Sequence, residues 1–299
     1  MTGAAILTGV TSGFGALALE QLASEYDGDI IVGARRPEDV KRKFGDRVHA
    51  THLDLEQLSS ADEFCQHVIE DLRLSEIACL GLNAGITSRK ISMTDDGMGR
   101  VFQVNYLGHF LMFQRLQAHL SDTALIVTTG SGTHDPEENI PLPAPKHADA
   151  RRLASPRTDP ERDRFGPRAA SRAYTSSKLC CILFAREMAR RYPSYRTLSF
   201  DPAFLPETNL AREFPSFAAA IVKRMVPRAM PPDRTGTVAT TAEAYAALFL
   251  GQLPLPENGG YLAMRSGKTR DVPPSKLARQ KEVGIRLWDD SLALLEGRL

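Results

Sequence analysis

Two side chains with complementary acid–base chemistry, Tyr174 and Lys178, lie four residues apart in the sequence. The residues after them, 179–192, are typical of a helix, and residues i and i+4 share one face of a helix. A phenol titrates near pH 10, and a positive charge beside it favours the phenolate and lowers its pKa. A tyrosine shifted in this way could give or take a proton near neutral pH. Because the same spacing occurs by chance on many surface helices, the pair needs support from elsewhere in the chain.

The N-terminal segment provides that support, because an apolar run, a cluster of glycines and a helical segment follow one another. Ala4 to Leu7 predicts a buried parallel strand, and Ala16 to Glu25 predicts a helix. Between them, Gly9, Gly13 and Gly15 have the spacing G-x-x-x-G-x-G. Glycines let a pyrophosphate approach the backbone, and a helix N-terminus offers it unpaired N–H groups. The arrangement predicts dinucleotide binding, although a tight strand–helix loop would use the same glycines.

The composition excludes several classes of protein. With 299 residues and a net charge of +1, the chain can bury one large core and has no overall field to attract nucleic acid or an anionic membrane. The cysteines at 65, 79, 180 and 181 are typical of free thiols in a reducing compartment. The N-terminal apolar run is too short for a signal peptide, and no stretch reaches the length of a membrane span. We expect a cytoplasmic protein that binds no nucleic acid.

Strand-like and helix-like segments alternate along the chain. Besides the first strand and helix, strands are predicted at 29–34, 48–53, 77–82, 124–129, 196–200 and 261–264, and helices at 59–72, 98–119, 235–250 and 275–296. This alternation predicts a single α/β domain over residues 1–299, with a doubly wound parallel sheet and helices on both faces. The carboxyl ends of the strands would then form one edge, where ligands bind.

Three segments depart from this alternation. Residues 134–170 contain seven prolines and no periodic apolar pattern, so we expect an insertion without regular structure. Residues 204–232 carry apolar side chains at helical spacing and predict either a helix packed on the core or a lid over an apolar substrate. Basic residues there would permit membrane contact, which we do not expect. Residues 275–297 predict an added helix for packing or for contact with a second copy of the chain.

Four further signals fall in a recognisable order. Asp54 follows the third strand, Asn-Ala-Gly follows the fourth at 83–85, Asn105 lies in the long helix, and Ser131 follows the fifth strand. With the glycine turn, which reads T-G-x-x-x-G-x-G from Thr8, and the Y-x-x-x-K pair, this order resembles the short-chain dehydrogenases/reductases over most of the chain. The resemblance implies a Rossmann fold, a nicotinamide cofactor and hydride transfer.

The resemblance also implies a role for each residue. Tyr174 would protonate the substrate atom that becomes electron-rich, and Lys178 would lower the tyrosine pKa and hold the nicotinamide ribose. Ser131 would orient the substrate oxygen, while Asn105 would support a water that relays protons to Lys178. The implied cofactor-binding residues are Thr8, Gly9, Thr11, Ser12, Gly13, Phe14, Gly15, Arg35, Arg36, Asp54, Leu55, Asn83, Ala84, Gly85, Tyr174, Lys178, Pro202, Phe204 and Thr208.

Several of these residues also have a purely structural interpretation. Asp54 could cap the turn that follows it, Asn83 could brace its loop, and Asn105 could be an ordinary polar residue on a helix. Ser131 is selected because it falls at the family's serine position after the fifth strand, although threonines nearby also carry hydroxyl groups.

The end of the second predicted strand indicates which nicotinamide nucleotide would bind. NAD-binding relatives carry an acid there for the ribose hydroxyls, whereas this chain has Arg35 and Arg36, and no acid lies between Ile30 and Pro37. Arginine forms charge-assisted, often bidentate bonds to a phosphate. The sequence therefore predicts NADP(H), with Arg35 as the first candidate for the 2′-phosphate and Arg36 as the second. The alternative is a pair of solvated surface arginines.

Two departures from the family pattern concern the substrate end. The usual Pro-Gly after the sixth strand is replaced by Pro202-Ala203, which puts a methyl group close to the expected nicotinamide. The long gap between Ser131 and Tyr174 is similar to that of the retinol dehydrogenase and light-dependent protochlorophyllide reductase branches, which reduce large apolar substrates. We expect an NADP(H)-dependent ketoreductase or enone reductase for a bulky, mostly apolar small molecule. The alternatives are a non-redox cyclase or isomerase and a nucleotide-binding sensor or scaffold.

Overall fold

A central eight-stranded sheet organises the computed structural model, which describes residues 3–70, 76–206 and 230–298. The strand order is β3-β2-β1-β4-β5-β6-β7-β8. Neighbouring strands are parallel, except that β7 and β8 are antiparallel. The strands are β1 (Ala4–Thr8), β2 (Ile30–Ala34), β3 (His49–His52), β4 (Ile77–Leu82), β5 (Leu120–Thr129), β6 (Arg196–Asp201), β7 (Gly260–Arg265) and β8 (Lys268–Asp271). The predicted doubly wound α/β fold is confirmed.

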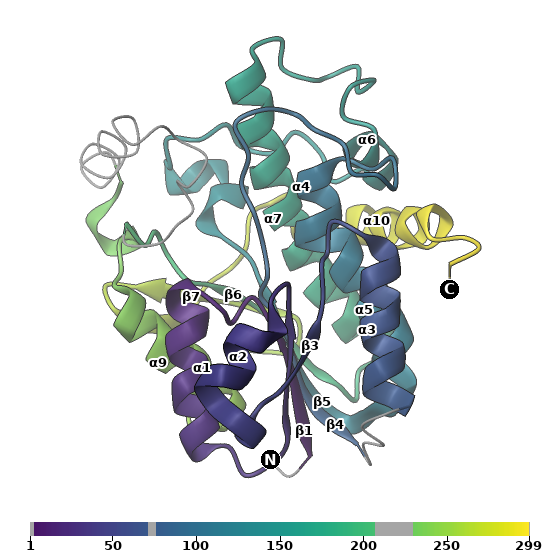
Figure 1. Cartoon of the computed structure of the whole chain (residues 1–299). Coiled ribbons are helices and arrows are strands. Elements are labelled where there is room, and N and C mark those ends of the chain that lie inside the picture. The colour runs from purple at the N-terminus through teal and green to yellow at the C-terminus, as the bar shows by residue number, and fades with distance from the viewer. Residues whose placement is uncertain (1–2, 71–75, 207–229, 299) are drawn as a thin grey trace.

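Helices cover both faces of the sheet (Figure 1). They are α1 (Gly13–Glu25), α2 (Pro37–Phe44), α3 (Leu58–Glu70), α4 (Arg100–Phe102), α5 (Gly108–Leu116), α6 (Ala150–Ala154), α7 (Gly166–Arg191), α9 (Val238–Phe249) and α10 (Lys281–Leu294). Shorter helical turns are η1 (Gly45–Arg47), η2 (Gln103–Leu107), η3 (Gln117–His119), η4 (Gly132–His134), η5 (Pro136–Glu138) and η7 (Pro232–Arg234). Helices α1, α2 and α9 lie on one face, and α3, α5, α7 and α10 lie on the other.

Alternation of side chains along the strands produces two apolar layers. Ala5 and Leu7 of β1 pack in the layer with α1 and α9, while Ile6 packs in the layer with α3, α5 and α7. This is the period of two that a strand imposes, and strands buried on both faces are continuously apolar for the same reason. The order reverses where β1 lies between β2 and β4, which places a ligand crevice at their carboxyl ends.

The insertion before Tyr174 is more regular than the sequence predicts. It contains η5 and α6, and α7 already begins at Gly166. Pro136 and Pro167 occupy the first turns of their helices, where the missing N–H is not needed. Ion pairs connect other parts of the insertion; for example, Arg152 pairs with Asp159 at 2.6 Å. The prediction of irregular structure throughout this segment is therefore wrong, because the prolines start helices here.

Other differences have local causes. Helix α2 was not predicted from the sequence. Val40 is its only buried residue, so the segment shows no repeat of apolar residues at helical spacing. The predicted helix at 98–119 is divided by the π-helical turn η2. The predicted C-terminal helix begins at Lys281 rather than 275. Most of the proposed lid, including Thr208, lies outside the described residues. Among the described helices, none combines the length and apolar character needed to cross a membrane.

Candidate active site

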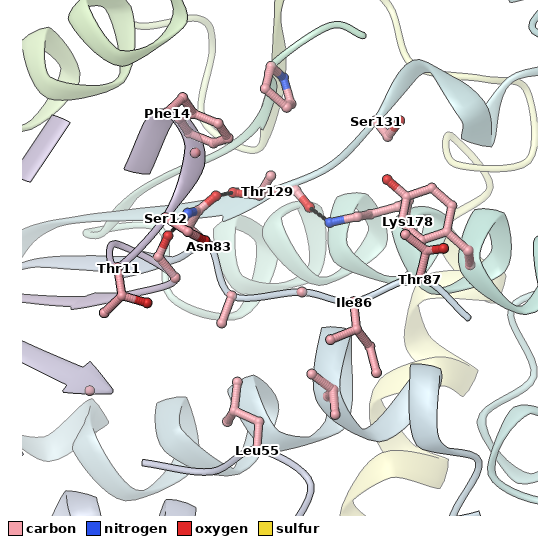
Figure 2. Close-up of a pocket in the computed structure, with 18 of the residues that line it drawn as sticks. Thr11, Ser12, Phe14, Leu55, Asn83, Ile86, Thr87, Thr129, Ser131 and Lys178 are labelled. Atoms are coloured by element: carbon pink, nitrogen blue, oxygen red, sulfur yellow. Dashed lines mark hydrogen bonds between the residues drawn. The ribbon is translucent and has the colours of Figure 1, made fainter. Parts of the chain in front are cut away.

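A cavity of about 380 Å³ opens at the carboxyl edge of the sheet, lined by residues that follow β1 to β6. Figure 2 shows Thr11 and Ser12 at one end and Ser131 and Lys178 at the other, with Asn83 and Thr129 between them. The cavity therefore joins the predicted nucleotide turn to the predicted acid–base residues.

The glycine turn is so closely packed, partly against the loop after β4, that larger residues cannot replace Gly9 or Gly15. Gly9 has φ +68°, and a Cβ there would lie 2.5 Å from the Ala84 nitrogen. A Cβ on Gly15 would lie 2.3 Å from the Gly9 carbonyl oxygen. Ser12 precedes α1 but its side chain makes no capping hydrogen bond, which leaves the first N–H groups of α1 for an anion. The backbone thus fits a pyrophosphate.

Thr8 and Asn83 brace this turn. The Thr8 hydroxyl oxygen accepts hydrogen bonds from the N–H groups of Asn83 (3.0 Å) and Ala84 (3.1 Å). The Asn83 amide donates to the Gly9 carbonyl at 2.8 Å, and its oxygen accepts from the Thr129 hydroxyl at 2.8 Å. Thr8 does not line the cavity. Its role in nucleotide binding is therefore to hold the turn rather than to touch the ligand.

The three predicted acid–base side chains line the same end of the cavity: Ser131, Tyr174 and Lys178. The Lys178 side chain is buried, and its ammonium donates to the Thr129 carbonyl oxygen at 2.9 Å. Burial lowers the pKa of Lys178. The ammonium lies 5.8 Å from the centre of the Tyr174 ring, so the pair shares one helix face as the spacing predicts.

The pKa of Tyr174 departs from the expectation. Burial raises it to about 12, the Ser131 hydroxyl acts in the opposite direction, and the Asp201 carboxylate adds to the rise. The prediction that Lys178 makes this phenol unusually acidic is wrong for the protein by itself, because desolvation dominates and the ammonium is directed at Thr129. Tyr174 is therefore protonated at neutral pH, which is the form that a proton donor requires.

Asn105 lies behind the cavity in the π-helical turn η2, where its side chain is 1% exposed. Its amide oxygen accepts from the Ile86 N–H at 2.7 Å, and its amide nitrogen donates to the Ile86 carbonyl (3.0 Å) and the Ser177 hydroxyl (2.9 Å). These bonds tie the loop after β4 to α7. The predicted residue thus positions both Ile86, which lines the cavity, and the helix that carries Tyr174.

Comparison with known proteins agrees with this geometry. Residues 3–143 match the sequence model of the short chain dehydrogenases. This part of the chain belongs to the short-chain dehydrogenase/reductase family. A chloroplastic protochlorophyllide reductase of Chlamydomonas reinhardtii is 29% identical over 252 residues, which cover 74% of this chain and 62% of that protein. A Streptomyces protein described as a daunorubicin C-13 ketoreductase is 28% identical over 208 residues, covering 66% of this chain and 64% of its own length.

A solved structure has a similar fold. A Mycobacterium paratuberculosis protein described as uncharacterised superposes with a TM-score of 0.68 and 25% identity, covering 98% of this chain and 93% of that one. By contrast, the chain spans only about three fifths of the protochlorophyllide reductases that it matches (62% of the algal protein).

The remaining predicted nucleotide residues of this family member divide into two groups. Those lining the cavity are Gly9, Thr11, Ser12, Gly13, Phe14, Arg35, Asp54, Leu55, Asn83, Ala84, Gly85 and Pro202. Gly15 packs behind the turn, and Arg36 lines a neighbouring cavity that Arg35 also reaches. Phe204 is not on the wall, because its backbone pairs with Arg234 and Gly236, and Leu205 lines the cavity instead.

Sequence reasoning missed an ion pair at the nucleotide end. Arg100 donates to both carboxylate oxygens of Glu56, at 2.8 and 2.6 Å, and both residues line the cavity beside Asp54. The hydrogen bond from Arg100 holds the pKa of Glu56 below its usual range. No local signal could reveal this pair, because its members are 44 positions apart and meet only through packing of α4 against the loop after β3.

A buried histidine, also missed, connects the glycine turn to Asn105. His109 Nδ1 donates to the Asn105 carbonyl oxygen at 3.3 Å, so Nε2 accepts a hydrogen bond from the Thr8 hydroxyl at 3.0 Å. Burial lowers the pKa of His109 to about 4. A lone histidine in the sequence gives no sign of such a role.

This histidine should make folding pH-dependent. In the unfolded chain it takes up a proton near pH 6.5, whereas in the folded protein it stays neutral until about pH 4. The unfolded state thus binds more protons below pH 6.5, and the free energy of unfolding should fall by about 2 kcal/mol between pH 7 and 5 on this account. Urea unfolding at both pH values measures the difference.

Two glutamine variants separate His109 from other groups. His109→Gln should show a smaller loss between pH 7 and 5 than the wild type, while a variant at the exposed His119 should retain the full loss. A wild-type pH dependence in His109→Gln would contradict the assignment.

Proposed function

We propose that the protein is an NADP(H)-dependent oxidoreductase that transfers a hydride between nicotinamide and a carbonyl or enone group of a bulky, mostly apolar small molecule. The observation that carries this proposal is the position of Tyr174. A protonated phenol, Ser131 and Lys178 line one end of a cavity whose other end is a glycine turn shaped for a pyrophosphate.

The residues present fit a dinucleotide. Gly9 and Gly13 both adopt positive φ and line the cavity, and Arg35 lines it directly after the second strand. Within the described ranges Arg35 forms no ion pair, whereas Arg36 pairs with Asp39 at 3.0 Å. A free guanidinium favours a 2′-phosphate and therefore NADP(H). The bound nicotinamide would supply the hydride.

In the proposed reaction, this chain's own side chains handle the oxygen and the proton. The Ser131 hydroxyl would hydrogen-bond the substrate oxygen, and the Tyr174 phenol would protonate it. Lys178, fixed by Thr129, would stabilise the phenolate that remains after transfer. Two of the four predicted residues, Ser131 and Tyr174, would thus contact the substrate. The other two, Asn105 and Lys178, would act through Tyr174 and its helix.

The apolar character of the substrate is supported by apolar side chains in the cavity wall. Ile86, Ala203 and Leu205 are among the lining residues. Two relatives are named as a protochlorophyllide reductase and a daunorubicin C-13 ketoreductase, and we propose a carbonyl compound of comparable bulk. Apolar walls with a few convergent polar groups are typical of such sites.

A spectrophotometric assay tests the proposal. The purified protein is mixed with NADPH and a panel of bulky ketones, quinones and enones, and the nicotinamide absorbance is followed. We expect oxidation of NADPH with at least one member of the panel and a slower reaction with NADH. NADPH binding without oxidation across the panel would instead support a non-redox enzyme or a sensor.

A further inference from the structure

Three residues other than glycine adopt left-handed backbone conformations in the described part of the chain. They are Asn139 (φ 52°), Ala203 (φ 63°) and Ser266 (φ 49°). This region is unfavourable for a residue with a Cβ atom, and such residues persist only where their surroundings hold them. Ala203 lines the cavity beside Pro202.

All three strained residues adjoin one network of buried and half-buried charges. Arg265, whose side chain is 7% exposed, donates to Asp201 at 3.0 Å and to Glu138 at 3.1 Å. Glu138 also accepts from Arg234. Asn139 follows Glu138, Ser266 follows Arg265, and Ala203 lies two positions after Asp201. The network thus connects η5, η7 and the ends of β6 and β7.

Asp201 is the member of this network nearest the cavity, and its side chain is 2% exposed. One carboxylate oxygen accepts from the Ala203 N–H at 3.0 Å, and the other accepts from the Tyr261 hydroxyl at 2.8 Å as well as from Arg265. A Cβ on Gly132 would lie 3.4 Å from this second oxygen. The carboxylate therefore lies beside Ala203, which lines the cavity, and close to Gly132, which follows the cavity-lining Ser131.

We infer that Asp201 is a positioning residue whose buried carboxylate holds Ala203 in its left-handed conformation and so fixes the part of the cavity wall that Ala203 forms with Pro202. A charge-assisted hydrogen bond is stronger than a neutral one, and Arg265 and Tyr261 prevent the carboxylate from rotating away. Glycine would need no such support, since it adopts positive φ without strain. The inference rests on the proposed function for its nucleotide-binding and catalytic readouts only.

Asp201→Asn tests the inference because it keeps the shape and removes the charge. We expect the dissociation constant of NADPH to rise and kcat/KM to fall by roughly tenfold, as for the loss of one charge-assisted hydrogen bond. Adding Ala203→Gly should restore most of both values, because the turn then needs no carboxylate. Nicotinamide fluorescence measures binding, and initial rates give kcat and KM separately.

Ser266→Gly is the matched control. Ser266 is strained in the same way and adjoins the same network, but it does not line the cavity. In the Asp201→Asn background it should raise Tm without restoring NADPH affinity or kcat/KM. Equal recovery by the two glycine variants would show that Asp201 serves stability alone and would overturn the inference, as would unchanged kinetics in Asp201→Asn.

Thermal unfolding supplies a readout that is independent of the nucleotide. Asp201→Asn and Ala203→Gly should be coupled, the glycine raising Tm more in the asparagine background than in the wild type, and this coupling should exceed that between the changes at 201 and 266. If the wild type neither binds nor oxidises NADPH, the proposed function fails while this coupling still decides the inference. If the Tm changes caused by Asp201→Asn and Ala203→Gly are simply additive, the inference is refuted.

Discussion

Replacing Tyr174 by phenylalanine should lower turnover by about 10²–10⁴, the contribution typical of a positioned general acid. The variant keeps the aromatic ring and loses only the phenolic hydroxyl, whose proton the raised pKa keeps in place at neutral pH. Ser131 would still orient the substrate oxygen but cannot replace the acid, because a hydroxyl of serine is a far weaker one. NADPH affinity should change little. Single-turnover oxidation of NADPH separates the chemical step from binding.

Tyr195→Phe is the control for this prediction. Tyr195 lies next to the start of β6, the end of the strand away from the cavity, and its hydroxyl donates to the Gln117 carbonyl oxygen at 3.0 Å. This variant removes the same atom and should retain wild-type turnover. Near-normal turnover in Tyr174→Phe would remove Tyr174 from the reaction, and an equal loss in both variants would indicate general destabilisation.

The fold and the members of the site could be predicted because their signals are local. The glycine turn depends on three residues within a short segment, and Tyr174 and Lys178 share a helix face through spacing alone. A buried strand is recognisable as an apolar run in the sequence, regardless of which strands it pairs with. The neighbourhood of Ser131 was predictable in the same way, since it directly follows the end of β5.

The electrostatics of the site could not be predicted because they depend on tertiary packing. The sequence spacing places Lys178 near Tyr174. It does not show that the Lys178 ammonium donates to the Thr129 carbonyl oxygen or that burial governs the pKa of the phenol. The contact between Asp201 and Arg265 joins positions 64 apart, and that between Glu138 and Arg265 joins positions 127 apart. In each case the sequence contains both partners without indicating that they meet.

Arg35→Ala should reduce NADPH affinity by about 10- to 100-fold while changing NADH affinity little, because a hydrogen bond to a charged group contributes about 1.5–3 kcal/mol. Arg35 is exposed and lines both the main cavity and its neighbour, so its guanidinium can reach a phosphate there without breaking an existing ion pair. The effect should shrink as salt is added, since exposed charges are screened. Dissociation constants of both nucleotides, measured at two ionic strengths, give the preference directly.

Two neighbouring arginines make this test specific. Arg36 already pairs with Asp39 at 3.0 Å, so Arg36→Ala should shift the preference less than Arg35→Ala. Arg42 pairs with the same aspartate and does not line either cavity, so Arg42→Ala changes the net charge equally and should leave the preference unchanged. If Arg35→Ala and Arg42→Ala have the same small effect, the surface charge as a whole attracts the nucleotide, and Arg35 does not recognise a 2′-phosphate.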